Sequence, residues 1–247
     1  DDSAQPASRW YSGAGIYRQV PLIVTAPTRI APWGTFVSTP EITADAATVR
    51  VQNVVTNGDV VGREVSLQMQ LTDPAGKVVQ TYETPGQLIP AGKTTRFVHD
   101  FTVQSPQRWD PKEPQMYQAS VTVRYNDKSF DDDVVPFGIR EFHFDPSTGF
   151  WMNGKNFKLY GVCLHHDGSA FGAAVPVSVW ERRLTELKGL GVNAIRTAHN
   201  PPAPEFLDLC DRMGLLVMDE FFDCWTVAKN PFDYHLDFNE WSKIDAR

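Results

Sequence analysis

The sequence predicts two folded parts in succession, an antiparallel β-sandwich and then a parallel α/β unit. The first prediction follows from apolar residues that recur at every second position between residues 29 and 142. The second follows from short apolar runs that alternate with helical spacings after residue 144. The chain has 247 residues, of which 42% are hydrophobic, so it can bury the core of one large domain or of two smaller ones.

The alternation in the first part is typical of strands that bury one face. It is clearest in three runs: Val49 and Val51; Val65, Leu67, Met69 and Leu71; and Val121, Val123 and Tyr125. Clusters of turn-forming residues separate the runs, at 57–59, 73–76, 90–92 and 126–128. Strands and turns at these spacings indicate a sandwich of immunoglobulin type.

A hairpin is predicted where the pattern changes, over residues 149–157. Its centre is Asn153-Gly154, the strongest two-residue signal for a tight turn between strands. We therefore expect Asn153 to have a structural role.

Beyond the hairpin, strands and helices alternate. We expect strands at 158–163, 194–198 and 215–219 and helices at 178–190 and 204–213. Apolar residues recur at helical spacing in both helices, and Gly191 and Gly214 stand where the helices end. Because a helix links each strand to the next, the strands are expected to run parallel in one sheet.

Both ends of the chain fall inside predicted elements. Residues 238–247 form a capped helix start, with Trp241 and Ile244 on one face and no C-cap, and residues 11–24 have the pattern of a last strand. Three βα units cannot close a barrel, which needs eight. We therefore expect a fragment of a longer protein.

Composition argues against several classes of function. The formal net charge of -7 and the lack of Lys/Arg runs disfavour a nucleic-acid partner. No apolar stretch approaches the ~20 residues that span a bilayer, so no membrane partner is expected. Cys163, Cys210 and Cys224 lack metal or redox spacing and are expected to be buried free thiols. The compartment stays open, with the periplasm or secretion favoured over the cytoplasm.

Polar side chains follow each predicted strand of the parallel sheet. They are His165, His166 and Asp167 after the first strand, Arg196, His199 and Asn200 at the end of the second, and Asp219 and Glu220 at the end of the third. In parallel α/β folds the functional site lies at the carboxyl ends of the strands. Imidazole and carboxylate groups bind vicinal hydroxyls, and Trp225 can cover the apolar face of a sugar, so a polyhydroxylated ligand fits.

Other interpretations of these residues stay open. Segment 165–167 is either part of the site or a loop with satisfied side chains, and for His166 alone the second is preferred. Arg196 pairs with Asp219 or Glu220, contacts a ligand, or does both. Adjacent carboxylates at a strand end diverge, so these two are expected to orient a ligand rather than to form a catalytic pair. A metal site at 165–167 is a weak alternative, because no third remote ligand is visible.

Several motifs together resemble glycoside hydrolase family 2. In order they are Tyr160-Gly161-Val162-Cys163-Leu164-His165-His166-Asp167, Glu181-Arg182-Arg183-Leu184, Asn193-Ala194-Ile195-Arg196-Thr197-Ala198-His199-Asn200-Pro201-Pro202, Cys210-Asp211-Arg212-Met213-Gly214 and Val217-Met218-Asp219-Glu220. The resemblance implies that residues 1–26 end a sugar-binding jelly roll, residues 27–143 form the immunoglobulin-like sandwich, and residues 144–247 begin a (β/α)8 barrel.

The resemblance also implies a retaining glycosidase that uses two glutamates, an acid/base and a nucleophile, and no cofactor. In the family the acid/base belongs to an Asn-Glu pair after a later barrel strand. The pair in this chain, Asn239-Glu240, lies at a predicted helix start, where the helix dipole favours an acid, and is not assigned. No catalytic residue is therefore expected here, and the chain alone is expected to be inactive.

Carried over by position, the resemblance makes a set of residues contact the sugar: His165, Arg196, His199, Asn200, Asp219, Glu220 and, where some relatives have an aspartate, Arg9. Asp167 and Trp225 join this set from the inventory of the strand ends. The motifs look most like those of β-galactosidases, so a terminal β-galactoside is the expected substrate. A β-glucuronidase, another specificity of the family, or a non-catalytic carbohydrate-binding module is the alternative, and a homo-oligomer is allowed.

Overall fold

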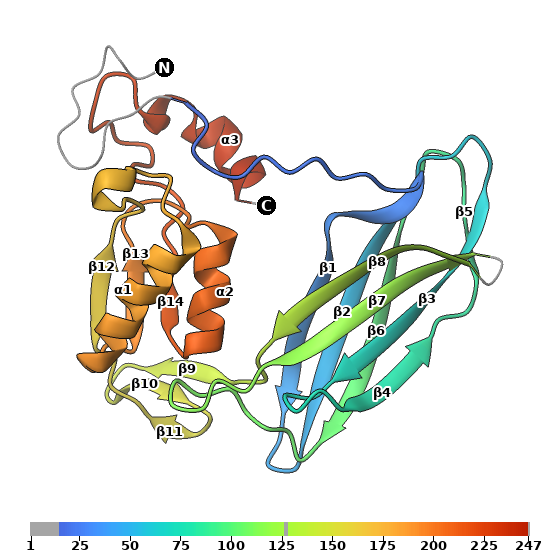
Figure 1. Cartoon of the computed structure of the whole chain (residues 1–247), viewed down its shortest axis with the longest axis horizontal. Coiled ribbons are helices and arrows are strands. Elements are labelled where there is room, and N and C mark those ends of the chain that lie inside the picture. The colour runs from blue at the N-terminus through green and yellow to red at the C-terminus, as the bar shows by residue number, and fades with distance from the viewer. Residues whose placement is uncertain (1–14, 126–127, 247) are drawn as a thin grey trace. The chain divides into compact units, whose positions relative to one another are not determined.

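The computed structural model of the chain describes residues 15–125 and 128–246. The chain divides into two compact units, one of residues 21–157 and one of residues 158–246 with residues 15–20. Each unit has its own hydrophobic core. Figure 1 labels the strands and helices of both units. None of the helices in the described ranges is both long and apolar enough to cross a membrane.

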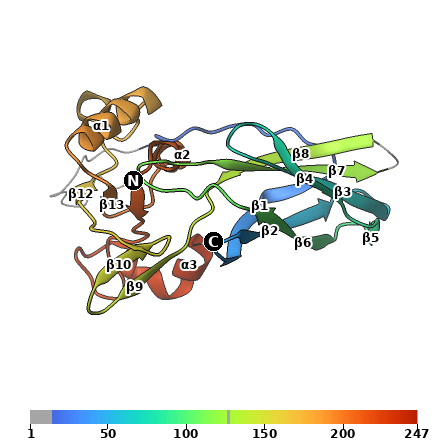
Figure 2. The same ribbon diagram turned by 90° about the horizontal axis from the view of Figure 1, so that it is seen from below.

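The first unit is built around two antiparallel sheets, which lie as two layers in Figure 2. One sheet has the order β1 (Thr28–Ile42), β2 (Ala46–Asn57) and β6 (Thr94–Gln104). The other has the order β4 (Val78–Glu83), β3 (Arg63–Thr72), β7 (Tyr117–Tyr125) and β8 (Lys128–Phe137), and β5 (Gln87–Ile89) pairs with β3. The predicted sandwich is therefore confirmed.

The core of the sandwich lies between the two sheets. Every second residue of β2 and β3 is buried, among them Val49, Val51, Leu67 and Met69. Full burial of one such side chain stabilises the fold by about 1.5–3 kcal/mol. The period-two pattern of the sequence thus follows from which face of each strand meets the other sheet.

The Asn-Gly hairpin forms as predicted. It joins β10 (Gly149–Met152) to β11 (Lys155–Asn156), while β9 (Phe142–Asp145) pairs with β10 on its other side. Asn153 and Gly154 have φ angles of 49° and 74°, which a two-residue turn of this kind requires. The Asn153 amide donates to the carbonyl of Trp109 at 3.0 Å, so its role is structural.

The second unit contains a three-stranded parallel sheet with two crossover helices. In chain order the elements are β12 (Gly161–Leu164), α1 (Val177–Gly189), β13 (Ala194–Thr197), α2 (Pro204–Met213) and β14 (Leu216–Met218), and the strands lie in the order β12-β13-β14. This confirms the predicted β-α-β-α-β arrangement, with strand boundaries displaced by at most three residues. Gly191 and Gly214 have φ angles of 86° and 72°, as residues that end helices commonly do.

The two faces of the parallel sheet differ in character. One face packs on the helices through buried side chains that include Trp180, Leu184, Ile195, Phe206 and Leu209. On the other face Cys163, Arg196 and Met218 stand in register on neighbouring strands. Cys163 is exposed and 62% of the Met218 surface is exposed, so this face is open among the described residues.

Two predictions about this unit need correction. Cys163 is exposed because it lies on the open face of the sheet, whereas Cys210 and Cys224 are buried as expected, and burial raises the pKa of Cys210 to about 12. The predicted strand at 11–24 is absent from residues 15–24, the part of it that the structure describes. A strand needs partners for its backbone hydrogen bonds, and these residues pair with no described strand.

The segment after β14 is mostly irregular. It contains the short helix η2 (Tyr234–Leu236) and then α3 (Phe238–Asp245), where the sequence predicts a helix start. A second short helix, η1 (Ser169–Phe171), follows β12. These connections lie beyond the carboxyl ends of the strands, where the candidate site is expected.

Candidate functional site

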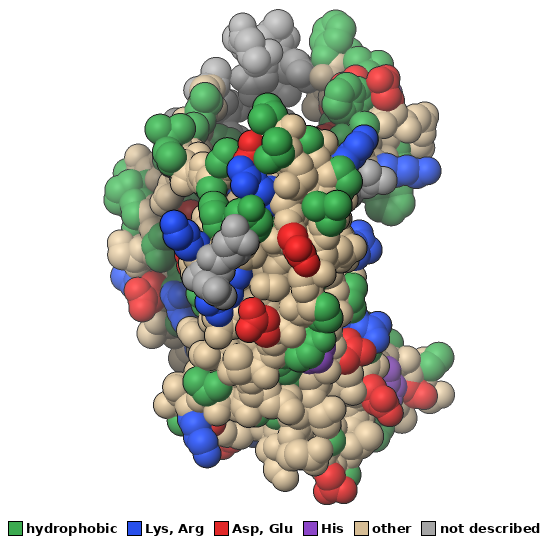
Figure 3. All heavy atoms as spheres, turned by 90° about the vertical axis from the view of Figure 1, so that its right-hand side faces the viewer, with side chains coloured by type: hydrophobic (Ala, Val, Ile, Leu, Met, Phe, Trp, Pro, Cys, Tyr) green, Lys and Arg blue, Asp and Glu red, His purple; other side chains and the backbone are tan. Residues whose placement is uncertain are grey.

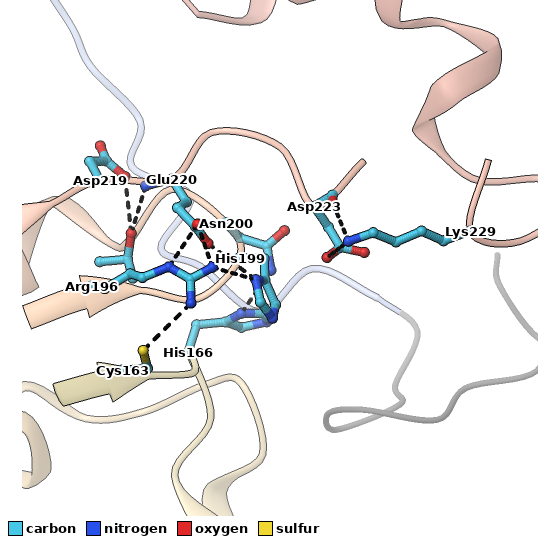
Figure 4. A network of polar contacts seen from close by, with 10 residues as sticks. Cys163, His166, Arg196, His199, Asn200, Asp219, Glu220, Asp223 and Lys229 are labelled. Atoms are coloured by element: carbon cyan, nitrogen blue, oxygen red, sulfur yellow. Dashed lines mark hydrogen bonds and ion pairs between the residues drawn. The ribbon is translucent and has the colours of Figure 1, made fainter. Parts of the chain in front are cut away.

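Three polar side chains meet at the carboxyl ends of β13 and β14, and we call them the rim cluster: Arg196, His199 and Glu220 (Figure 4). The Arg196 Nε and Nη2 atoms donate to Glu220 Oε1 at 2.8 and 2.6 Å. His199 Nδ1 lies 3.1 Å from Glu220 Oε2. Glu220 therefore holds a cation with one oxygen and an imidazole with the other.

The rim cluster is partly open to solvent. The side chains of Arg196, Glu220 and His199 are 38%, 26% and 22% exposed. An ion pair at this exposure contributes little to stability, because water screens it. Hydroxyl groups of a ligand can therefore replace water beside this ion pair. Little binding energy is lost if they disrupt the pair.

The Cys163 thiol is a further neighbour of Arg196. Its Sγ atom accepts from Arg196 Nη1 at 3.5 Å, from the adjacent strand β12. The guanidinium is thus held on two sides, by a carboxylate and by a sulfur. This contact follows from the register that places the two residues side by side on the open face.

His199 has two neighbours at one ring nitrogen. Its Nδ1 lies 3.3 Å from Arg196 Nη2 and 3.1 Å from the carboxylate of Glu220. The carboxylate contact is shorter and opposite in polarity to an N–H, so we assign the ring proton to Nδ1. With the proton on Nδ1, Nε2 of an uncharged ring is a hydrogen-bond acceptor.

Thr197 joins β13 to the segment after β14 from the other face of the sheet. Its buried hydroxyl accepts from the Glu220 amide at 3.0 Å and donates to Asp219 Oδ1 at 3.2 Å. Asp219 and Glu220 therefore point to different partners, as predicted for adjacent carboxylates. Asp219 as a residue is exposed, yet desolvation of its carboxyl raises its pKa above the ordinary value, against the opposing effects of Thr197 and Arg18.

The histidines after β12 lie next to the residues that follow β13. The ring of His165 meets that of His199 edge to face, with centroids 5.6 Å apart. His166 Nδ1 lies 3.4 Å from Asn200 Nδ2, and the ring of Tyr17 stacks on His166 at 5.7 Å. Burial and then the nearby Arg18 cation lower the pKa of His166. This imidazole is therefore biased toward its neutral form, in which Nδ1 can accept from the amide.

The remaining predicted residues have other positions. The backbone carbonyl of Asp167 accepts from Arg183 Nη1 at 2.7 Å, and its charge opposes the lowering of the His166 pKa. Trp225 is 67% exposed and stacks on Phe238 of α3 with ring centroids 6.0 Å apart, a contact outside the rim cluster. Arg9 lies outside the described residues.

The loop that carries Trp225 is held together by its own polar contacts. Lys229 Nζ donates to Asp223 Oδ1 at 2.7 Å, as Figure 4 shows beside the rim cluster. Asp233 accepts from the amides of Lys229 and Asn230, each at 2.7 Å. These bonds order a stretch that has little regular secondary structure.

The carboxylates of the rim are engaged by neighbouring side chains, and no cluster of metal-binding side chains is found among the described residues. No group of three or more His, Cys, Asp or Glu side chains within residues 15–125 and 128–246 is placed to hold a metal ion. Glu220 is engaged by Arg196 and His199, while Asp219 turns to Thr197. The cluster suits hydrogen bonding to a ligand better than proton transfer or nucleophilic attack.

Sequence reasoning missed the contributions of Tyr17, Arg18, Cys163 and Thr197. For Thr197 the only signal is its place between Arg196 and the end of the strand.

The surface drawn in Figure 3 carries acidic and basic side chains interspersed, without a dominant sign over its described residues. The face drawn there therefore shows no patch dominated by one sign of charge.

Two family matches cover most of the chain. Residues 28–140 match the family described as glycosyl hydrolases family 2, and residues 146–241 match the TIM barrel domain of the same family. The first match contains β1 to β8, and the second contains the parallel sheet with its strand ends.

Individual proteins are similar along the whole chain. A β-galactosidase of Bacteroides ovatus is 43% identical over 245 residues, which are 99% of this chain and 29% of that protein. A putative β-glucuronidase of Formosa agariphila is 35% identical over 248 residues, or 100% of this chain and 23% of that protein. A solved glycosyl hydrolase family 2 member from Bacteroides cellulosilyticus has a TM-score of 0.88 and 39% identity over 96% of this chain and 30% of its own. The chain thus spans less than a third of each of these relatives.

Proposed function

The chain belongs to glycoside hydrolase family 2, and from this membership we propose that it supplies the sugar-holding part of a retaining glycosidase that cleaves terminal β-galactosides. In this proposal residues 27–143 are the sandwich domain and residues 144–247 begin the catalytic barrel, after the end of a jelly roll at 1–26. The acid/base and nucleophile glutamates are contributed by residues outside this chain. A longer protein therefore carries the activity.

The observation that supports this proposal is the rim cluster. A carboxylate, a guanidinium and an imidazole converge at the carboxyl ends of parallel strands while staying partly open to solvent. Glu220 can accept from a sugar hydroxyl, Arg196 can donate to one, and Nε2 of His199 can accept from a third group. Vicinal hydroxyls need such mixed donors and acceptors.

The hydrogen bonds that Arg196 and Arg18 already make within the protein favour a neutral sugar over a uronate as the ligand. A glucuronide carboxylate is best bound by a cation that is not already held by other acceptors, whereas a sugar hydroxyl needs only one remaining N–H. Arg196 is bound by Glu220 and Cys163, and Arg18 donates to two backbone carbonyls. We therefore prefer β-galactosides, while relatives with either specificity are similar to this chain.

Steady-state kinetics of the full-length protein test the specificity. We expect kcat/KM for a nitrophenyl β-galactoside to exceed that for the matching β-glucuronide by more than about tenfold, since a buried carboxylate without a partner costs at least 1.4 kcal/mol. The reverse preference would refute the β-galactoside proposal and support a β-glucuronidase. Binding of both sugars without turnover would support a non-catalytic module instead.

Two variants test the assignment of roles. The 247-residue chain alone should not hydrolyse the nitrophenyl galactoside, and turnover by it would overturn the placement of the glutamates outside it.

His199→Ala in the full-length protein should lower kcat/KM by about ten- to a hundredfold, because it removes a hydrogen bond to the sugar and frees Glu220. An unchanged kcat/KM would refute the assignment of His199 to the sugar-binding site.

A further inference from the structure

We infer that Tyr17 and Arg18 form a clasp that positions the segment Asn200-Pro201-Pro202 beside the rim cluster, and that Arg18 is a positioning residue for sugar binding. The inference rests on the proposed function, because it assigns a role to residues around the same site. Figure 4 shows the pale blue trace of the N-terminal residues passing beside the labelled side chains.

Arg18 binds the segment through two backbone carbonyls. Its Nη1 donates to the Pro202 carbonyl at 2.9 Å and its Nη2 to the Pro201 carbonyl at 2.6 Å. Both bonds are partly buried and span more than 180 residues of sequence. Proline has no N–H, so at these two residues the carbonyl is the only backbone group that can be held by a hydrogen bond. A planar guanidinium fits two adjacent acceptors, which a single ammonium does not.

Tyr17 contacts the same segment indirectly, through His166. The two rings stack at 18° with centroids 5.7 Å apart, and His166 Nδ1 lies 3.4 Å from the amide of Asn200. Tyr17 and Arg18 are neighbours in the chain, so these contacts link both ends of Asn200-Pro201-Pro202 to the same two residues. The loop has no regular secondary structure of its own to fix it.

The clasp acts on the site through chain connectivity. Asn200 directly follows His199, whose Nδ1 lies 3.1 Å from Glu220. The Thr197 hydroxyl ties the end of β13 to the Glu220 amide, and the clasp holds the residues that follow His199 and Asn200. Release of the clasp leaves the strand in place but lets His199 and Asn200 move relative to Glu220.

The experiment compares Arg18→Met and Arg18→Lys in the full-length protein, with Arg50→Met as a matched control. Arg50 pairs with Asp100 on the exposed face of the sandwich, so it tests the loss of an arginine away from the site. Arg18→Met should raise KM for the nitrophenyl galactoside about tenfold, because two charge-assisted bonds are lost, with a smaller change in kcat. Arg18→Lys should recover part of this loss, and Arg50→Met should leave KM unchanged.

A second readout is independent of turnover. The titratable groups that act on His166 are Arg18, Asp167 and His165, and Arg18 lowers its pKa. NMR titration should show a higher His166 pKa in Arg18→Met than in the parent protein, and little change in Arg18→Lys. The NMR signals of the His199 and Asn200 backbone amides should shift in Arg18→Met, while the Glu220 amide, bound to Thr197, should keep its protection from hydrogen exchange.

The outcomes separate the clasp from the proposed reaction. If Arg18→Met changes neither the His166 titration nor the NMR signals of the His199 and Asn200 backbone amides, the clasp is refuted, whatever the enzyme does. If both change but the parent protein does not hydrolyse or bind the galactoside, the clasp stands and the proposed function fails. If both change and KM is unaltered, the positioning role in sugar binding is refuted.

Discussion

At the scale of single residues, Thr197 contributes more to this site than its chemistry suggests. Its hydroxyl is buried and bonds the amide of Glu220 and the carboxylate of Asp219 at the same time. One small side chain thereby fixes the start of the segment that follows β14. Glu220 reaches Arg196 and His199 because its backbone is held in this way.

Thr197→Val should therefore destabilise the second unit. Valine has nearly the same shape but leaves the Glu220 amide without its acceptor, which costs about 1–3 kcal/mol. Thermal or urea unfolding of the purified protein measures the change. Thr102→Val is the control, because Thr102 is exposed on β6 and should change the free energy of unfolding by less than about 0.5 kcal/mol. Equal stability of Thr197→Val and the parent would show that water replaces the hydroxyl.

The sequence predicted some residue contacts and not others, for a geometric reason. Pairing of Arg196 with an acidic residue after β14 was an open alternative, and the structure assigns it to Glu220. Neighbouring strands place such residues a few ångströms apart, so strand order suffices to suggest the pair. Arg18 contacts carbonyls 183 and 184 residues away, and no local pattern marks a backbone acceptor.

At the scale of elements, the helix ends show most directly how sequence sets structure. Gly214 follows α2 in the left-handed region, with φ 72° and ψ 51°, and its amide donates to the carbonyl of Cys210. Glycine adopts this conformation without a steric penalty. The turn that follows sends the chain into β14 and so places Asp219 and Glu220 at the rim.

Gly214→Ala should destabilise the protein by about 1 kcal/mol, because alanine is strained at a positive φ. Gly189→Ala is the matched control: this glycine is the last residue of α1, has no positive φ, and would place its new Cβ in open space. Alanine there should stabilise the protein slightly, by about 0.5 kcal/mol. Denaturant unfolding of both variants gives the comparison, and the same sign of change in both would contradict it.

The secondary-structure predictions are correct where the local sequence pattern alone determines the element. Residues 204–213 were predicted as a helix, and α2 has these bounds. The strand expected at 11–24 is absent from its described residues, although its apolar sequence suits a strand. A helix satisfies its hydrogen bonds internally, whereas a strand forms only beside a partner, so strand predictions depend on the rest of the molecule.

At the scale of the whole molecule, the two units have separate hydrophobic cores. The sandwich core contains residues such as Val65 and Leu67, and the core of the second unit contains Leu184 and Ile195. Cooperative unfolding follows shared contacts, so each core should govern the stability of its own unit. The rim cluster belongs to the unit that contains the second core.

Leu184→Ala should destabilise the second unit by about 2–5 kcal/mol, because it opens a cavity at a fully buried position. Hydrogen exchange should speed up in β13 and α2 while the amides of β2 and β3 keep their protection. Leu67→Ala should produce the reverse pattern. Leu190→Ala, at a side chain that is 82% exposed, should alter neither unit measurably. Loss of protection in both units from one core substitution would show that they unfold together.

Periodicity and motif order by themselves determined the class of each part: an alternating sandwich, a parallel α/β unit, and polar residues after each of its strands. These features are local, because a residue's neighbours in sequence fix which face it presents. Only the tertiary structure decided which polar groups meet. It separated Asp219 from Glu220, turned Trp225 toward Phe238, exposed Cys163, and brought Tyr17 and Arg18 to the loop after β13. Such contacts join segments that are distant in the sequence, through side-chain packing and through hydrogen bonds to backbone carbonyls. Neither kind of contact produces a periodic pattern in the sequence.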